Sequence, residues 1–169
     1  MAEIYLAGGC FWGMQKYFES IAGVLSTEVG YANGPALHPT YEQVCESSGH
    51  AETVRIEYNP TQAPLPFLLG LYFDAIDPTS VNRQGGDRGI QYRTGIYYTD
   101  PADLPVIQDE LSKLQERYST PIAIEVKPLE NFGSAEEYHQ NYLDKNPGGY
   151  CHISPEKIRK AKETVYRQK

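Results

Sequence analysis

The order of the predicted strands and helices constrains the fold of this chain more than any other feature. Four short apolar or alternating segments predict strands, and two segments with apolar residues every three or four positions predict helices. These elements are expected, in chain order, at residues 4–7 (strand), 11–21 (helix), 24–32 (strand), 51–58 (strand), 65–76 (helix) and 91–98 (strand). This order suggests an α+β domain with a split-βαβ, ferredoxin-like sheet in a two-layer sandwich. An α/β domain with another strand order is the alternative.

The rest of the chain adds elements to this unit without dividing it. We expect a helix at 101–118, a strand at 122–127, a helix at 134–143 that Ser134 and Glu137 cap, and a last helix that begins at Ser154-Pro155. No repeat or linker separates these parts. The sequence therefore predicts one domain over residues 1–169, with additional C-terminal helices and an irregular tail at about 144–154.

The composition argues against several classes of partner. The 169 residues carry a net charge of −7 and no basic run, which disfavours a surface for nucleic acid or for an anionic membrane. No stretch approaches the roughly 18 apolar residues that a membrane helix needs. Residues 1–20 also lack the basic start and long apolar core of a signal peptide. We therefore expect a cytoplasmic protein, and we expect it to be a monomer.

Cys10 lies where the first predicted strand ends and the first predicted helix begins. Gly8 and Gly9 precede it and allow a tight turn that leaves the sulfur uncovered, while Phe11 and Trp12 follow it. A thiol in the first helical turn lies next to unpaired backbone N–H groups and the positive end of the helix dipole, which favour the reactive thiolate. The alternative is that Cys10 is a small buried hydrophobic residue among core aromatic residues.

Glu52 is the second candidate because of its place in the strand predicted at 51–58. The period of two puts Glu52 on the apolar side of that strand with Val54 and Ile56. Burial without a cation raises the pKa of a carboxyl group, so that Glu52 would stay protonated near neutral pH and act as an acid. The alternative is a solvated carboxylate at a frayed strand end. Cys10, His50 and Glu52 also have the residue types of a cysteine hydrolase, but we interpret His50 as a residue at the boundary between loop and strand.

Five motifs of this chain resemble the A-type methionine sulfoxide reductase family. The run GCFWG at 9–13 is similar to the active-site signature of that family, and GHAE at 49–52 is similar to its glutamate motif. The runs TYEQVC at 40–45, GDRGIQYR at 86–93 and GGYCH at 148–152 also match, and all five occur in the family's order. The resemblance extends over nearly the whole chain.

The resemblance implies reduction of methionine sulfoxide, free or in peptides and proteins, at the epimer with S configuration at sulfur. It implies that Cys10 attacks the sulfur and that Glu52 protonates the oxygen. The other pocket residues that it implies are Tyr41 and Tyr92, which hold the oxygen, Asp87, which lies in the pocket, and Phe11 and Trp12, which form the slot for the S-methyl group.

The resemblance also implies how the thiols are recycled. Cys10 becomes a sulfenic acid, which Cys151 in the glycine-rich tail traps as a Cys10–Cys151 disulfide. Since no cysteine follows Cys151, this implies a direct disulfide that thioredoxin, or a dithiol such as dithiothreitol in vitro, then reduces. The resemblance implies no bound cofactor and no metal. We interpret the third thiol, Cys45, as a packing residue.

Three other functions compete with this one on the residues alone. A cysteine hydrolase or acyltransferase would use Cys10 and His50 to form an acyl-thioester. A redox sensor would pair Cys10 with Cys151 under oxidants without turning over a sulfoxide. A zinc site of Cys45, His50, Cys151 and His152 is disfavoured, because these spacings lack paired Cys-x-x-Cys elements.

Overall fold

A six-stranded sheet forms the centre of the molecule. The computed structural model describes residues 2–33, 50–84, 87–88, 90–136, 139–145, 153 and 155–164. The strand order is β7-β6-β1-β3-β2-β8, and all neighbours are antiparallel except β6 and β7. The strands are β1 (Ala2–Ala7), β2 (Val24–Ala32), β3 (Ala51–Tyr58), β6 (Gly95–Tyr98), β7 (Glu125–Pro128) and β8 (Phe132–Ser134). A separate pair consists of β4 (Arg83–Gln84) and β5 (Asp87–Arg88).

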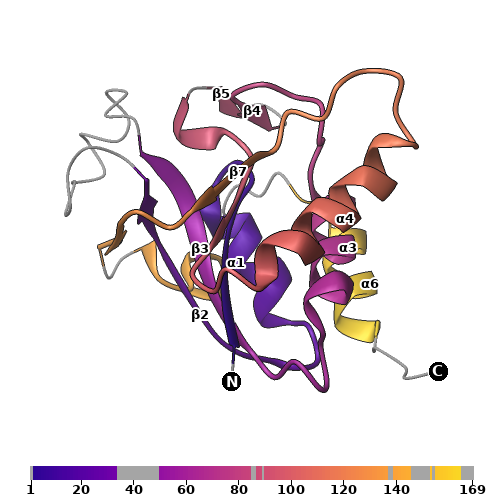
Figure 1. Cartoon of the computed structure of the whole chain (residues 1–169). Helices are drawn as coiled ribbons and strands as arrows, with labels where there is room; N and C mark the ends of the chain where they lie inside the picture. Colours follow the sequence, from indigo (N-terminus) through magenta and orange to yellow (C-terminus); the bar gives the residue numbers. More distant parts are fainter. Residues whose placement is uncertain are drawn as a thin grey trace.

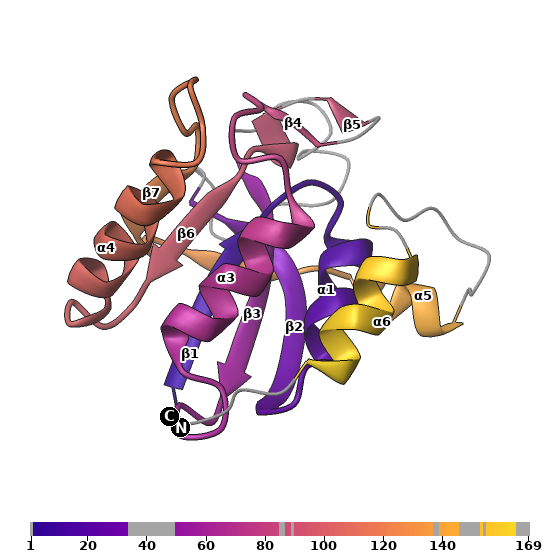
Figure 2. The same cartoon turned by 90° about the vertical axis from the view of Figure 1, so that its right-hand side faces the viewer.

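Helices cover one side of this sheet, which gives an α+β architecture. They are α1 (Phe11–Glu19), α3 (Leu65–Ala75), α4 (Asp103–Gln115), α5 (Tyr142–Lys145) and α6 (Pro155–Glu163), with a 3₁₀ turn η1 (Ile90–Tyr92). Figure 1 shows α3, α4 and α6 to the same side of the strands, and Figure 2 looks onto this side, with α3 and α6 in front. The short helix α5 contacts α1, and α6 contacts both α1 and α3. The C-terminal segments thus lie next to the first helix of the chain.

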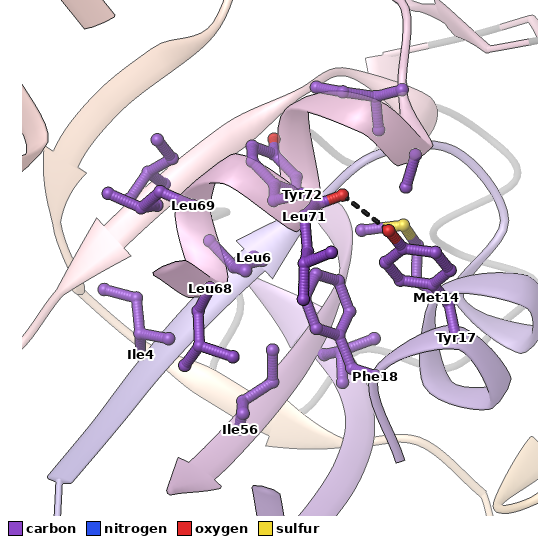
Figure 3. Close-up of a cluster of buried hydrophobic side chains, with 14 of the residues drawn as sticks. Ile4, Leu6, Met14, Tyr17, Phe18, Ile56, Leu68, Leu69, Leu71 and Tyr72 are labelled. Atoms are coloured by element: carbon purple, nitrogen blue, oxygen red, sulfur yellow. Dashed lines mark hydrogen bonds between the residues drawn. The ribbon is translucent and has the colours of Figure 1, made fainter. Parts of the chain in front are cut away.

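An apolar core fixes the helices against the sheet. Ile4 and Leu6 from β1, Ile56 from β3, Phe18 from α1 and Leu68 from α3 are all fully buried in one cluster (Figure 3). Full burial of a side chain of this size stabilises the folded state by about 1.5–3 kcal/mol relative to exposure in water. The cluster therefore holds α1 in a defined position relative to β1 and β3.

The sequence predicted most of these elements. The strands predicted at 24–32 and 51–58 coincide with β2 and β3, and the helices predicted at 11–21 and 65–76 are α1 and α3 with slightly earlier ends. The predictions of α4, β7 and α6 are confirmed with shifted bounds. Within the described ranges, no helix combines the length and the apolar character needed to cross a bilayer.

Two predicted elements were wrong in part. The strand predicted at 91–98 covers only Gly95–Tyr98, because the residues before it form the turn η1. The capped helix predicted at 134–143 is wrong at its start, where Ser134 belongs to β8 and pairs with Gly30 of β2. Among the described residues of this range, the α-helical ones are Tyr142 and Leu143, which begin α5. Pairing with a distant strand outweighs a local capping pattern, because helix propensity is a weak preference.

Candidate active site

The junction between β1 and α1 places Cys10. Ala7 ends β1 and pairs with Thr53 of β3 on one side and with Gly95 of β6 on the other. Gly9 has φ of 85°, a conformation that favours glycine. A Cβ atom on Gly8 would lie 2.6 Å from a methyl carbon of Ile76, so a side chain there would displace the packing around α3. The two glycines thus allow the chain to turn from the sheet into α1.

Cys10 is the N-cap residue of α1, which corrects its predicted place inside the first turn. Its backbone is extended, and its carbonyl oxygen accepts the N–H of Met14 at 3.5 Å. Cys10 is only 7% exposed, so the prediction of an uncovered sulfur was wrong. The physical reason is that the start of α1 faces β3 instead of solvent.

A buried carboxyl group meets the start of α1. The backbone N–H of Phe11 donates a hydrogen bond of 3.3 Å to Oε1 of Glu52, which lies in β3. Glu52 is 2% exposed and is on the same side of β3 as the core residues Val54 and Ile56, which confirms its predicted place on the apolar side. A carboxyl group therefore lies directly beside the residue that follows Cys10.

Phe11 and Trp12 belong to an aromatic cluster at the first turn of α1. The Phe11 ring centroid lies 5.6 Å from that of Tyr31 in β2 and 5.3 Å from that of His139. Trp12 stacks on Tyr142 of α5, with centroids 3.8 Å apart and planes 13° apart. Aromatic faces of this kind provide an apolar, polarizable surface next to Cys10 and Glu52.

His139 fixes the indole of Trp12. Nε1 of Trp12 donates to Nδ1 of His139 at 3.0 Å, which requires that Nδ1 carries no proton. Burial lowers the pKa of His139, while nearby Glu136, whose Oε2 lies 3.7 Å from Nε2, acts in the opposite direction. The net effect favours a neutral imidazole, which is the form that can accept the indole N–H.

Sequence patterns contained no signal for His139 and Tyr142 as site residues. Trp12 and His139 are 127 positions apart, and the segment around His139 was predicted as an ordinary capped helix. Segment 139–145 also binds α1 through the backbone N–H of Asn141, which donates to Oε1 of Gln15 at 2.7 Å. Only the folded structure shows that this segment lies against the first helix.

The structure describes the other predicted site residues to different extents. Tyr92 is partly buried in η1, which packs against β3, and Asp87 lies in β5 opposite Gln84. His50 is fully buried directly before β3, as expected for a boundary residue. Four residues of the sequence predictions lie outside the described residues: Tyr41, Cys45, Cys151 and His152. The predicted disulfide and three ligands of the disfavoured zinc site therefore also lie outside them.

Comparison with known proteins gives matches over most of the chain. A family model described as peptide methionine sulfoxide reductase matches residues 2–169. The peptide methionine sulfoxide reductase MsrA of Lachnoclostridium phytofermentans is 65% identical over 151 residues, which cover 89% of this chain and 91% of that protein. The crystal structure of Mxr1 from Saccharomyces cerevisiae in reduced form matches with a TM-score of 0.85 at 37% identity and covers 90% of each chain. Mxr1 in complex with Trx2 matches with a TM-score of 0.59 at 26% identity over 83% of each chain.

Proposed function

Because the chain belongs to the peptide methionine sulfoxide reductase family, we propose how its own residues carry out the family's reaction. The chain is a peptide methionine sulfoxide reductase of the A type, which reduces methionine sulfoxide to methionine and is recycled by thioredoxin. The observation that carries the proposed site is the hydrogen bond from the Phe11 N–H to Glu52, which joins the start of the Cys10 helix to a buried carboxyl group.

The proposed first step takes place at the sulfur of Cys10. Its thiolate attacks the sulfur of the sulfoxide, the substrate S–O bond breaks, and the oxygen ends on Cys10 as a sulfenic acid. The sulfoxide gains two electrons and becomes the thioether of methionine, while Cys10 loses two. One thiol and one sulfoxide thus give one sulfenic acid and one methionine. The N-terminus of α1 supports this role, because backbone N–H groups there favour a negative charge.

We assign the proton for the sulfoxide oxygen to Glu52. A neutral carboxyl group can accept the Phe11 N–H with its carbonyl oxygen and donate a proton with its hydroxyl. Tyr41, Tyr92 and Asp87 are proposed to complete the oxygen side. Their support is the family motifs and the packing of η1 against β3.

The methyl group of the substrate is proposed to bind between Phe11 and Trp12. The contacts of Trp12 with His139 and Tyr142 support this proposal, because they fix the orientation of the indole ring in the absence of substrate. The family implies the S epimer. A fixed methyl slot, a fixed acid and a fixed direction of attack by Cys10 together suit discrimination between epimers, because with methyl and oxygen in place the two epimers exchange the side chain and the lone pair of the sulfur.

The proposed recycling uses Cys151. Its thiol attacks the sulfenic acid, a Cys10–Cys151 disulfide forms and the oxygen leaves as water. A dithiol then takes up the disulfide by exchange and is itself oxidised. The match to Mxr1 in complex with Trx2 supports thioredoxin as this dithiol.

The proposal also includes the sheet topology, the domain extent, the cellular location and the oligomeric state. We classify strands β6-β1-β3-β2 as a split-βαβ sheet, supported by their antiparallel order and by helical crossovers between β1 and β2 and, after β3, through α3 to β6. We further propose one domain over residues 1–169, a cytoplasmic monomer and a site that holds no cofactor. The family match over residues 2–169 supports the single domain, and the acidic composition, which disfavours an anionic membrane surface, supports the cytoplasmic location.

A single-turnover experiment tests the proposed function. Protein reduced and freed of excess thiol is mixed with each epimer of methionine sulfoxide, and methionine is measured over time. The wild type is expected to release about one methionine per chain from the S epimer only, and Cys10→Ser is expected to release none, because a hydroxyl replaces the nucleophilic sulfur. A Cys10→Ser protein that forms methionine at the wild-type rate would contradict the mechanism.

A further inference from the structure

The hydroxyl of Tyr72 lies between the end of β1 and the start of β6. Tyr72 is a fully buried residue of α3 (Figure 3). Its hydroxyl donates to the carbonyl oxygen of Ala7 at 2.5 Å and accepts the N–H of Gly95 at 3.2 Å. Ala7 and Gly95 are the last pair of the β1–β6 ladder, so the phenol bridges the two strands where their pairing ends.

Each of these strand ends leads to one part of the proposed site. Cys10 follows Ala7 by three residues, and Tyr92 precedes Gly95 by three residues. We call the segment 7–10 the thiol arm and the segment 92–95 the phenol arm. One hydroxyl group therefore holds the backbone from which both arms depart.

The surroundings of Tyr72 leave its ring little freedom. A Cβ atom on Gly8 would lie 3.5 Å from the ring, so the thiol arm passes directly over it. The neighbouring carbonyl, of Leu71, accepts the hydroxyl of Tyr17 from α1 at 2.8 Å, which Figure 3 shows as a dashed line. Burial raises the pKa of Tyr72 well above its ordinary value, so its hydroxyl keeps the proton it donates to Ala7. A buried hydroxyl that stays protonated and bonds to both Ala7 and Gly95 can bridge the two backbones.

We propose that Tyr72 is a positioning residue that holds the thiol arm and the phenol arm at a fixed separation, and so sets the distance between the attacking sulfur and the group that holds the sulfoxide oxygen. This inference rests on the proposed roles of Cys10 and Tyr92. Within the described residues, the hydrogen bonds of the Tyr72 hydroxyl go to backbone atoms of Ala7 and Gly95, and Tyr72 acts through these atoms.

The test compares two buried phenols that each lose one oxygen atom. Tyr72→Phe removes the bridge, and Tyr17→Phe removes a hydroxyl that bonds the backbone carbonyl of Leu71, which belongs to neither arm. Both variants are expected to lower the melting temperature. The rate of methionine release in a single turnover at saturating S epimer is then measured per folded chain, together with the substrate concentration at half-maximal rate.

Tyr72→Phe is expected to lower the maximal single-turnover rate about 10- to 100-fold with little change in the half-saturating concentration, because a small misplacement of reacting groups costs rate at that scale. Tyr17→Phe is expected to keep the wild-type rate within about twofold. Equal rates for the two variants would overturn the proposal, since a purely structural hydroxyl predicts the same rate for every folded chain. If Tyr72→Phe melts too low, the rates are measured in sucrose, which favours the folded state without restoring the hydroxyl. A chain that still fails to fold would assign Tyr72 to folding and would also overturn the positioning role.

The same experiment separates this inference from the proposed function. Cys10→Ser is included in each series, and methionine release from it would refute the nucleophile itself. A wild-type burst that depends on Cys10, together with a normal rate for Tyr72→Phe, would refute only the positioning role of Tyr72.

Discussion

At the scale of single residues, a backbone N–H group fixes the position of the Glu52 carboxyl group. Its Oε1 accepts the Phe11 N–H, and the backbone position of Phe11 is fixed by the helix that Cys10 begins. A side-chain donor could rotate away, whereas this N–H moves only with α1. This hydrogen bond holds the carboxyl group at the start of the helix before substrate binds. The proposed acid would need preorganisation of this kind.

Replacing Glu52 by glutamine tests its proposed role as an acid with little change in shape. The amide oxygen of glutamine can still accept the Phe11 N–H, but the side chain has no acidic proton to give. Glu52→Gln is therefore expected to fold with nearly the wild-type melting temperature and to slow single-turnover methionine formation about 10²- to 10⁴-fold. Quenched-flow measurement of methionine from the S epimer gives this rate.

Glu57→Gln is the matched control for Glu52→Gln. Glu57 lies in the same strand and makes an ion pair of 3.4 Å with Arg55 on the partly exposed side. Its replacement is expected to leave the single-turnover rate unchanged. An unchanged rate in Glu52→Gln as well would assign proton delivery to another group.

At the scale of secondary-structure elements, the carboxylate of Glu125 links the parallel edge strand β7 to the neighbouring strand β6 and to Arg93. Oε2 of Glu125 accepts hydrogen bonds from Tyr97 at 2.7 Å and from Arg93 at 3.0 Å, and Lys127 lies 3.0 Å from Oε1. Burial alone would raise the pKa of Glu125, but these donors together lower it below the ordinary value of 4.5. Because Arg93 is in the segment that connects η1 to β6, this cluster also supports the phenol arm.

Glu125→Gln is expected to destabilise the protein in a manner that depends on pH. Since the folded-state pKa is lowered, the ionised carboxylate contributes stability above the ordinary pKa of 4.5, and this contribution is lost as the pH falls through the folded-state value. The variant should unfold about 1–3 kcal/mol more easily than the wild type at pH 7. The difference in the free energy of unfolding should shrink as the pH falls below 4.5. Urea unfolding followed by circular dichroism at several pH values measures it.

Asp109→Asn provides the comparison for this prediction. Its pair with Lys113 on α4 has a length of 3.1 Å, but both side chains are about two-thirds exposed. Such a pair contributes little, so its removal should change the stability by less than about 1 kcal/mol at any pH. A Glu125→Gln protein that behaves like Asp109→Asn would show that the cluster does not secure β7.

Whether an element could be predicted depended on whether a local sequence pattern or a contact with a distant residue determines its structure. β2, β3 and α3 were predictable because apolar periodicity is a local pattern that their burial reproduces. β8 was not, because its strand character comes from pairing with β2 about a hundred residues earlier, and the cap-like Ser134 suggested a helix instead. The start of β6 was missed for a related reason, since Gly95 bonds to Tyr72 of α3 and not to a sequence neighbour.

At the scale of the whole molecule, the candidate site also combines features set by local sequence with features set by long-range contacts. Cys10 at a strand-to-helix junction and Glu52 on an apolar strand face were predictable separately, because each depends on its own neighbours. Their meeting joins residues 41 positions apart, and the clamp on Trp12 joins residues 127 positions apart. No single-chain pattern contains these distances. The family resemblance implied that Cys10 and Glu52 belong to one site. The contacts of His139 and Tyr72 became visible only in the folded structure.

The two ends of the predicted tail are both anchored next to the Cys10 helix. On one side, α5 stacks Tyr142 on Trp12 and ends at Lys145, six residues before Cys151. On the other side, α6 begins at Pro155 and packs against α1. Six residues span at most about 20 Å when extended. The proposed Cys10–Cys151 disulfide therefore requires the end of α5 to lie within this reach of Cys10.

Cys151→Ser is therefore expected to separate the first turnover from recycling. The variant should release about one methionine per chain at the wild-type rate, because Cys10 and the acid are intact, but it should show no sustained turnover with thioredoxin, because its sulfenic acid finds no resolving thiol. Cys45→Ser is the control and is expected to sustain thioredoxin-coupled turnover like the wild type. Loss of recycling in Cys45→Ser, with recycling kept in Cys151→Ser, would assign the resolving role to Cys45. Mass spectrometry of the oxidised wild type, digested without reduction, gives the independent check, since the prediction requires a Cys10–Cys151 cross-link.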